Sequence, residues 1–155
     1  MKFEQRATIP APIDDVWAFL MDVQRVAVCA PGVESVEPVE NDKYRGTLRI
    51  AMGPVRFSLA GDVSIVEQDE ANKTAIMLAE AADKRAGGAV KATMRMSLNP
   101  AVGTPSPTTE LRIETDAQLM GKSFEFGQPI IRKKADQLMT DFAKNIAKAL
   151  TSEHA

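Results

Sequence analysis

The residue types that most often carry out catalysis are scarce in this chain. His154 is the only histidine of the 155 residues, and it lies one residue from the C-terminus, where fraying is more common than catalysis. A hydrolytic triad needs a histidine between a nucleophile and a carboxylate, so the sequence disfavours that chemistry. Cys29 is the only cysteine, and its small apolar neighbours are typical of a buried side chain rather than of a reactive thiolate. We therefore expect no catalytic residue of either type.

Metal and phosphate chemistry also lack their usual ligands. No His/Cys spacing of a metal site occurs, and the acidic pair at 14–15 is explained by the positive end of a helix dipole. The glycine pair at 87–88 lacks the lysine spacing of a phosphate loop and indicates a hairpin turn. Glu80 and Asp83 end a predicted strand, but two carboxylates alone do not make an acid/base site. The sequence predicts no metal and no cofactor.

Composition and charge narrow the class of partner. Hydrophobic residues make up 45% of the chain and charged residues 26%, and the formal net charge is −2. A nucleic-acid partner is disfavoured, because neutralising phosphates requires clustered Lys and Arg. Residues 1–6 carry charges where a signal peptide would be apolar, and no apolar run approaches the ~20 residues that span a bilayer. We expect a soluble, cytoplasmic protein.

Alternating apolar and polar residues predict that most of the chain forms half-buried strands. The expected strands cover residues 2–9, a stretch that begins at Val33, and residues 44–52, 55–65, 75–80, 90–98 and 111–119. Such strands, joined by short turns, predict a seven-stranded antiparallel sheet with one polar face. The apolar face of that sheet needs a cover.

Three helices are expected around this sheet. Pro12 suits the first turn of a helix, Asp22 is a typical cap for a second one, and the Pro-Gly pair at 31–32 ends it. Apolar residues at three- and four-residue steps predict a long helix from Pro129 to about Leu150. The order of elements describes one α+β domain, in which a curved sheet grips the C-terminal helix over a hydrophobic cavity.

Two kinds of side chain dominate the predicted inner face of the sheet. Many are small, namely Ala7, Gly46, Gly61, Ala75, Ala79, Ala92, Thr115 and Ala117. Others are methionines, namely Met52, Met77, Met94 and Met96, with Met139 on the facing helix. Small residues that leave volume and adaptable methionines fit a ligand cavity. The same residues also fit a solid core with a closely approaching helix, and the pattern alone leaves both interpretations open.

For a cavity, we can name the residues expected to contact the ligand. The candidate lining consists of Leu48, Ile50, Phe57, Leu59, Met77, Met94, Met96, Ala117, Leu119, Ile131, Met139 and Phe142. The candidates for its mouth or gate are Lys84, Arg85, Phe124 and Phe126. A solvated turn is the alternative for the two cations, and a hydrophobic anchor for the helix start is the alternative for the two aromatic residues. The inward polar groups are few: Gln5, Tyr44 and Thr115.

Several motifs resemble the family of the carbon monoxide dehydrogenase G protein, CoxG. They are Pro-Ala-Pro-Ile-Asp-Asp-Val-Trp-Ala-Phe-Leu-Met-Asp at 10–22, Ala-Pro-Gly-Val-Glu-Ser-Val at 30–36, Gly-Pro-Val at 53–55, Gly-Asp-Val at 61–63, Gly-Lys at 121–122 and Gly-Gln-Pro-Ile-Ile at 127–131. The likeness spans essentially the whole chain to Leu150. It implies the helix-grip fold of the START-like (SRPBCC) superfamily, as a single domain over residues 1–150 with a short polar tail at 151–155.

The resemblance implies three functions. The first is a non-catalytic carrier of an isoprenoid quinone or a lipid that serves a carbon monoxide dehydrogenase-type molybdenum hydroxylase. The second is an adaptor that recruits such a hydroxylase to the inner face of the membrane, where the protein itself is peripheral. The third and most distant is a cyclase or dehydratase, because some relatives in the superfamily are enzymes. The sequence does not name the ligand or the oligomeric state.

Overall fold

The computed structural model, which describes residues 1–121, 124 and 127–153, has the predicted α+β architecture. Its strands are β1 (Lys2–Ile9), β2 (Val33–Glu40), β3 (Lys43–Met52), β4 (Val55–Asp69), β5 (Thr74–Asp83), β6 (Gly88–Pro100) and β7 (Thr109–Met120). They form a seven-stranded antiparallel sheet in the order β1-β7-β6-β5-β4-β3-β2. The first strand therefore pairs with the last one, which leaves β1 and β2 as the two edges.

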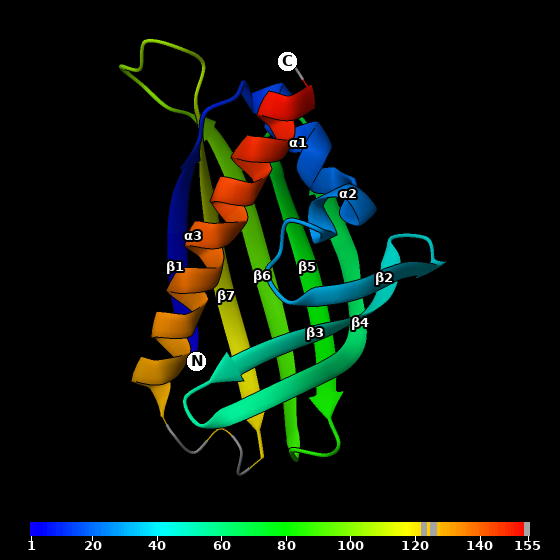
Figure 1. The fold of residues 1–155 in the computed structure, drawn as a ribbon. Coiled ribbons are helices and arrows are strands. Elements are labelled where there is room, and N and C mark those ends of the chain that lie inside the picture. The colour runs from blue at the N-terminus through cyan, green and yellow to red at the C-terminus, as the bar shows by residue number, and fades with distance from the viewer. Residues whose placement is uncertain (122–123, 125–126, 154–155) are drawn as a thin grey trace.

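Two short helices and one long one cover the inner face of this sheet (Figure 1). Helix α1 (Ile13–Met21) begins after Pro12, and α2 (Val23–Ala27) is capped by Asp22, whose carboxylate accepts the N–H of Arg25 at 3.4 Å. Helix α3 (Gln128–Glu153) lies along β1 and crosses the sheet towards α1. It extends to Glu153, past the predicted end near Leu150 and into the predicted polar tail.

The sheet curls sharply where two glycines face each other. Gly46 of β3 pairs with Gly61 of β4. A Cβ atom at Gly61 would collide with the carbonyl oxygen of Glu80, and one at Gly46 with the carbonyl oxygen of Ser35. The missing side chains thus allow neighbouring strands to approach closely and bend. Figure 1 shows the result: β2 and β3 run across the view in front of β5, β6 and β7, so the sheet wraps towards α3.

The interior contains two separate clusters of buried side chains. The larger one lies between α1, the second half of α3 and the middle of the sheet, and includes Val16, Trp17, Leu111 and Ile146. The smaller one lies at the other end, where α3 begins, and consists of Met52, Phe57, Leu59 and Phe124 with partly buried neighbours. Both clusters are well filled, and the space between them is not.

Candidate functional site

An apolar cavity of about 340 Å³ lies between the two clusters. Leu59 of its wall belongs to the smaller cluster, and Phe142 of α3 packs against the larger one. The remaining inward-facing lining comes from α2 and its following loop, from β2, and from the neighbouring strands β3 to β6: Val23, Val26, Ala27, Ala30, Val33, Val36, Tyr44, Gly46, Leu48, Gly61, Val63, Ala79, Ala81 and Val90. The volume lies within the range of small-molecule sites.

Small residues on adjacent strands create this volume. Gly46 pairs with Gly61, Gly61 with Ala81, and Ala81 with Val90, so one row across four strands carries little side-chain bulk. Ala79 lies one inward position further along β5 and also lines the cavity. The small inner residues of the sheet therefore leave space here instead of drawing the long helix into close contact.

The cavity wall is almost entirely hydrocarbon. Strand alternation directs the side chains of the charged wall positions to the opposite face of the sheet. Arg45 and Asp62 pair with each other on that face, with the Arg45 Nε atom 3.0 Å from the Asp62 Oδ1 atom. Glu80 likewise lies 3.5 Å from the Nζ atom of Lys91. No charged side chain from these strands is thus directed at a ligand.

Three of the predicted lining residues, Leu48, Leu59 and Phe142, surround this cavity. Four others fill the smaller cluster beside it, as its buried member Phe57 and its partly buried neighbours Ile50, Leu119 and Ile131. Met96 and Met139 belong to the larger, solid cluster. Met77 and Met94 face each other across β5 and β6, and Ala117 is buried in β7, all apart from the cavity wall. A role for these residues in binding stays a prediction.

The predicted mouth residues lie at the end of the molecule where α3 begins. Lys84 and Arg85 are exposed in the β5–β6 turn. Phe124 stacks on Phe57, with ring centroids 4.7 Å apart and planes 10° apart, and this pair closes the interior at that end. Phe126 lies outside the described residues. As the structure stands, Phe124 anchors the approach to α3.

The chain's carboxylate and thiol near the cavity have structural roles. Asp83 is buried and accepts the N–H groups of Ala86 and Arg85 at 3.0 Å and of Ser58 at 2.7 Å, and these bonds hold the pKa of its carboxyl below the ordinary value. Burial raises the pKa of the Cys29 thiol, against a smaller opposing effect of the Arg25 charge. Among the described residues, no group of three His, Cys, Asp or Glu side chains is placed to hold a metal ion.

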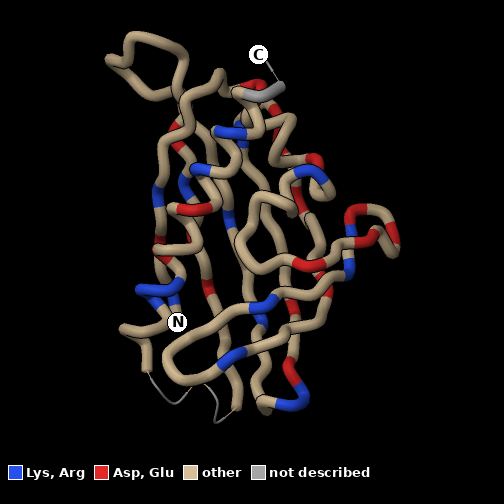
Figure 2. The backbone as a smooth tube through the Cα atoms, viewed as in Figure 1, with Lys and Arg blue, Asp and Glu red and all other residues tan. Residues whose placement is uncertain are grey.

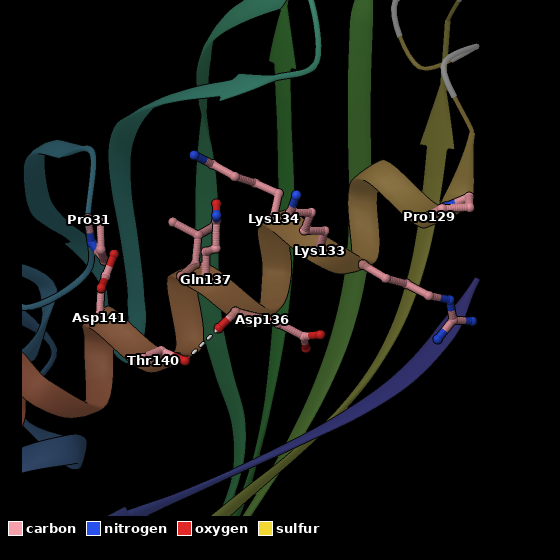
Figure 3. Close-up of a pocket in the computed structure, with 10 residues that line it drawn as sticks. Pro31, Pro129, Lys133, Lys134, Asp136, Gln137, Thr140 and Asp141 are labelled. Atoms are coloured by element: carbon pink, nitrogen blue, oxygen red, sulfur yellow. Dashed lines mark hydrogen bonds between the residues drawn. The ribbon is translucent and has the colours of Figure 1, made fainter.

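A second depression lies on the outside of α3 (Figure 3). It is larger, about 830 Å³, but open and lined by Lys, Asp, Gln and Thr side chains of the helix together with Pro31. Pro31 borders it from one side, and the neighbouring Ala30 lines the apolar cavity, so the loop after α2 separates the two spaces. Asn145 of α3 fixes this loop by donating its Nδ2–H to the Cys29 carbonyl at 2.9 Å. The openness and charged wall of this depression make it a poorer small-molecule site than the apolar cavity.

Sequence reasoning missed the part of the wall that α2 supplies. Val23, Val26 and Ala27 come from a helix of five residues, which is too short for a periodic pattern to reveal its buried side. The small inward residues did carry a usable signal, because Gly46, Gly61 and Ala79 were recognisable as inner positions with little volume.

Comparison with known proteins gives the geometry a family. The sequence model of CoxG, the G component of carbon monoxide dehydrogenase, matches residues 6–151. This chain belongs to the CoxG family. No match is found among curated proteins. No helix in the described ranges has the length and apolar character that crossing a bilayer requires.

Solved structures confirm the helix-grip fold of this CoxG family member. A conserved protein from Geobacillus kaustophilus is 23% identical, with 98% of this chain and 96% of that chain covered and a TM-score of 0.87. An aromatase/cyclase from a Streptomyces species is 14% identical, with 100% and 96% covered and a TM-score of 0.69. A norcoclaurine synthase from Thalictrum flavum is 13% identical, with 100% and 96% covered and a TM-score of 0.69. At these identities the likeness establishes the fold alone.

Proposed function

We propose that this CoxG family member is a non-catalytic carrier that holds an apolar small molecule, an isoprenoid quinone or a lipid, for a carbon monoxide dehydrogenase-type molybdenum hydroxylase. The observation that carries the proposal is the apolar cavity between two filled clusters, walled by hydrocarbon side chains from α2, the sheet and α3. Burying a ligand there yields about 0.8 kcal/mol for each methylene group. The family description supplies the hydroxylase as partner.

The size of the cavity limits how much of a ligand it encloses. One water-sized unit occupies ~30 Å³ of liquid, so about 340 Å³ holds roughly eleven non-hydrogen atoms. A quinone ring system or a short acyl segment has that size. The rest of a long isoprenoid or acyl tail would lie outside the cavity, along the apolar edges of α2 and β2.

A carrier fits the site better than an enzyme does. Catalysis by a cyclase or dehydratase requires an acid or base within hydrogen-bonding reach of the bound substrate. The inward-facing lining has no carboxylate, imidazole, amine or thiol within the described residues. Asp83, the nearest buried acid, is committed to three backbone N–H groups.

Native mass spectrometry of the purified protein, followed by solvent extraction, tests the carrier function. We expect one equivalent of a quinone or lipid, or uptake of one equivalent of added ubiquinone-1 or decanoic acid by a protein that is purified empty. A protein that is empty and takes up neither compound would refute the carrier and favour an adaptor that recruits the hydroxylase without a ligand. Co-purification with the hydroxylase tests the partnership separately.

One end of the molecule supports transient contact with an anionic membrane, at which the carrier would load. Figure 2 shows basic residues at the start of α3 and at the β5–β6 turn, at the same end. The described residues place no ion-pair partner within 4 Å of the exposed cations there, and large apolar side chains are exposed beside them. This basic end consists of Arg56, Lys84, Arg85 and Lys133, with Met120 (50% exposed) and Ile130 (37%). Each cation contributes about 1 kcal/mol near an anionic surface.

Vesicle flotation tests this contact. We expect the protein to float with phosphatidylglycerol-containing vesicles and not with pure phosphatidylcholine, and the Lys84→Glu/Arg85→Glu variant to lose flotation. The matched control is Lys91→Glu/Arg95→Glu, which makes the same charge change on the outer face of β6. Equal loss in both variants would show that net charge, and not the basic end, governs the attraction.

A further inference from the structure

Tyr44 is the one residue that brings a hydrogen-bonding side chain to the inward-facing wall of the cavity, within the part of the chain that the structure describes. It lies on the inner face of β3 together with Gly46 and Leu48, and it pairs with Pro38 of β2 and Val63 of β4. Its ring is half-buried among the hydrocarbon groups of the wall. The hydroxyl group therefore adds a single polar point to an apolar site.

This hydroxyl group has no protein partner among the described residues, whereas the other inward polar groups are used or lie elsewhere. No hydrogen bond of Tyr44 to a described side chain or backbone group occurs. Gln5 donates its Nε2–H to the Asp136 carboxylate on α3 at 3.0 Å, and Thr115 is apart from the cavity wall. Because a tyrosine hydroxyl both donates and accepts, an oxygen atom of either kind on a ligand would satisfy it.

We propose that Tyr44 is the specificity-determining residue of the cavity: its hydroxyl hydrogen-bonds a carbonyl or hydroxyl oxygen on an otherwise apolar ligand. The inference rests on the proposed carrier function and names the ligand class more closely. The ligand is an apolar molecule with an oxygen atom where it meets the start of β3, and pure hydrocarbons of the same shape bind without that contribution.

The test compares two probes that share a bicyclic skeleton, 1-tetralone with its carbonyl group and tetralin without one. Their dissociation constants are measured by isothermal titration calorimetry for the natural protein and for Tyr44→Phe, which keeps the aromatic ring. We expect Tyr44→Phe to weaken 1-tetralone about five-fold, within the roughly two- to ten-fold worth of one neutral hydrogen bond, and to leave tetralin unchanged. Thr47→Val is the matched control, because it removes a hydroxyl from the outer face of the same strand. It should leave both constants unchanged.

The outcomes separate this inference from the carrier function. Equal affinities of Tyr44→Phe and the natural protein for 1-tetralone would refute a bond to the hydroxyl. Equal weakening of both probes would refute it too, since Tyr44 would then contribute packing only. In either case binding itself would uphold the cavity. Binding of neither probe to the natural protein would overturn the cavity and the inference together.

Discussion

Filling the cavity from Ala79 should abolish most of its affinity without damage to the fold. Ala79 is half-buried in β5 and lines the cavity, and Ala79→Leu adds three carbon atoms to that space. At about 0.8 kcal/mol for each carbon atom of ligand displaced, the loss is about 2.4 kcal/mol, or roughly 50-fold in the dissociation constant. Gly46 and Gly61 are unsuitable for the same purpose, because a Cβ atom there would collide with neighbouring backbone carbonyl groups.

The stability of the empty variant is a second, independent measurement. Extra methylene groups in a well-packed core cost about 1–3 kcal/mol, because side chains and backbone must shift. In an empty cavity they find space, so urea unfolding should show Ala79→Leu to be at least as stable as the natural protein. Ala82→Leu is the control: it makes the same change on the exposed, opposite face of the same strand and should alter neither property.

Calorimetric titration with tetralin and urea unfolding are then read together. The reasoning would be refuted if Ala79→Leu lost about 1–3 kcal/mol of stability and bound tetralin as tightly as before. That result would mean that side chains fill the space around Ala79 and that the ligand binds elsewhere. Loss of affinity in Ala82→Leu as well would point to an indirect effect of bulk in β5.

Three further predictions concern the scaffold around the cavity. The Glu4 carboxylate accepts hydrogen bonds from Arg6 and Arg112, which lower its pKa from 4.5 to about 2, so it stabilises the fold above about pH 4.5 and loses this effect as the pH falls towards 2; Glu4→Gln should therefore show a smaller drop in unfolding free energy between pH 5 and pH 3, and an unchanged drop would contradict the link. Asn145→Ala removes the bond to the Cys29 carbonyl, worth about 1 kcal/mol, and should lower Tm by roughly 2–4 °C in calorimetry, with the exposed Lys144→Ala as a neutral control. The Cys29 thiol is buried with a raised pKa, so labelling by a thiol reagent at neutral pH should be slow until urea unfolds the chain, and fast labelling of the native protein would contradict its burial.

Much of the fold was predictable because its local signals agree. Alternation along β3, β4 and β6 fixed which side chains face inward, and this periodicity survives whatever the strands pack against. The caps at Pro12 and Asp22 and the apolar stripe before Leu150 located the helices to within a few residues. These features depend on neighbours in sequence, which a single chain displays.

The candidate site was less predictable because inward orientation does not give depth along a strand. Met96 and Leu48 both face inward, but Met96 lies under α1 in the larger cluster, while Leu48 reaches the cavity. The difference arises from where α2 and α3 lie along the sheet, which depends on the curl at Gly46 and Gly61. Long-range packing of this kind leaves no period in the sequence.

The separation of the two filled clusters explains how the protein can carry a cavity between them. The larger cluster joins α1, α3 and the central strands through fully buried residues such as Ile9, Leu111 and Ile146, and none of its buried members among the described residues lines the cavity. Phe57 and Phe124 close the smaller cluster independently. The folding free energy therefore comes mainly from side chains that a ligand never contacts, so the cavity can be filled and emptied while the sheet and α3 keep their places. A carrier that must release its ligand requires this division.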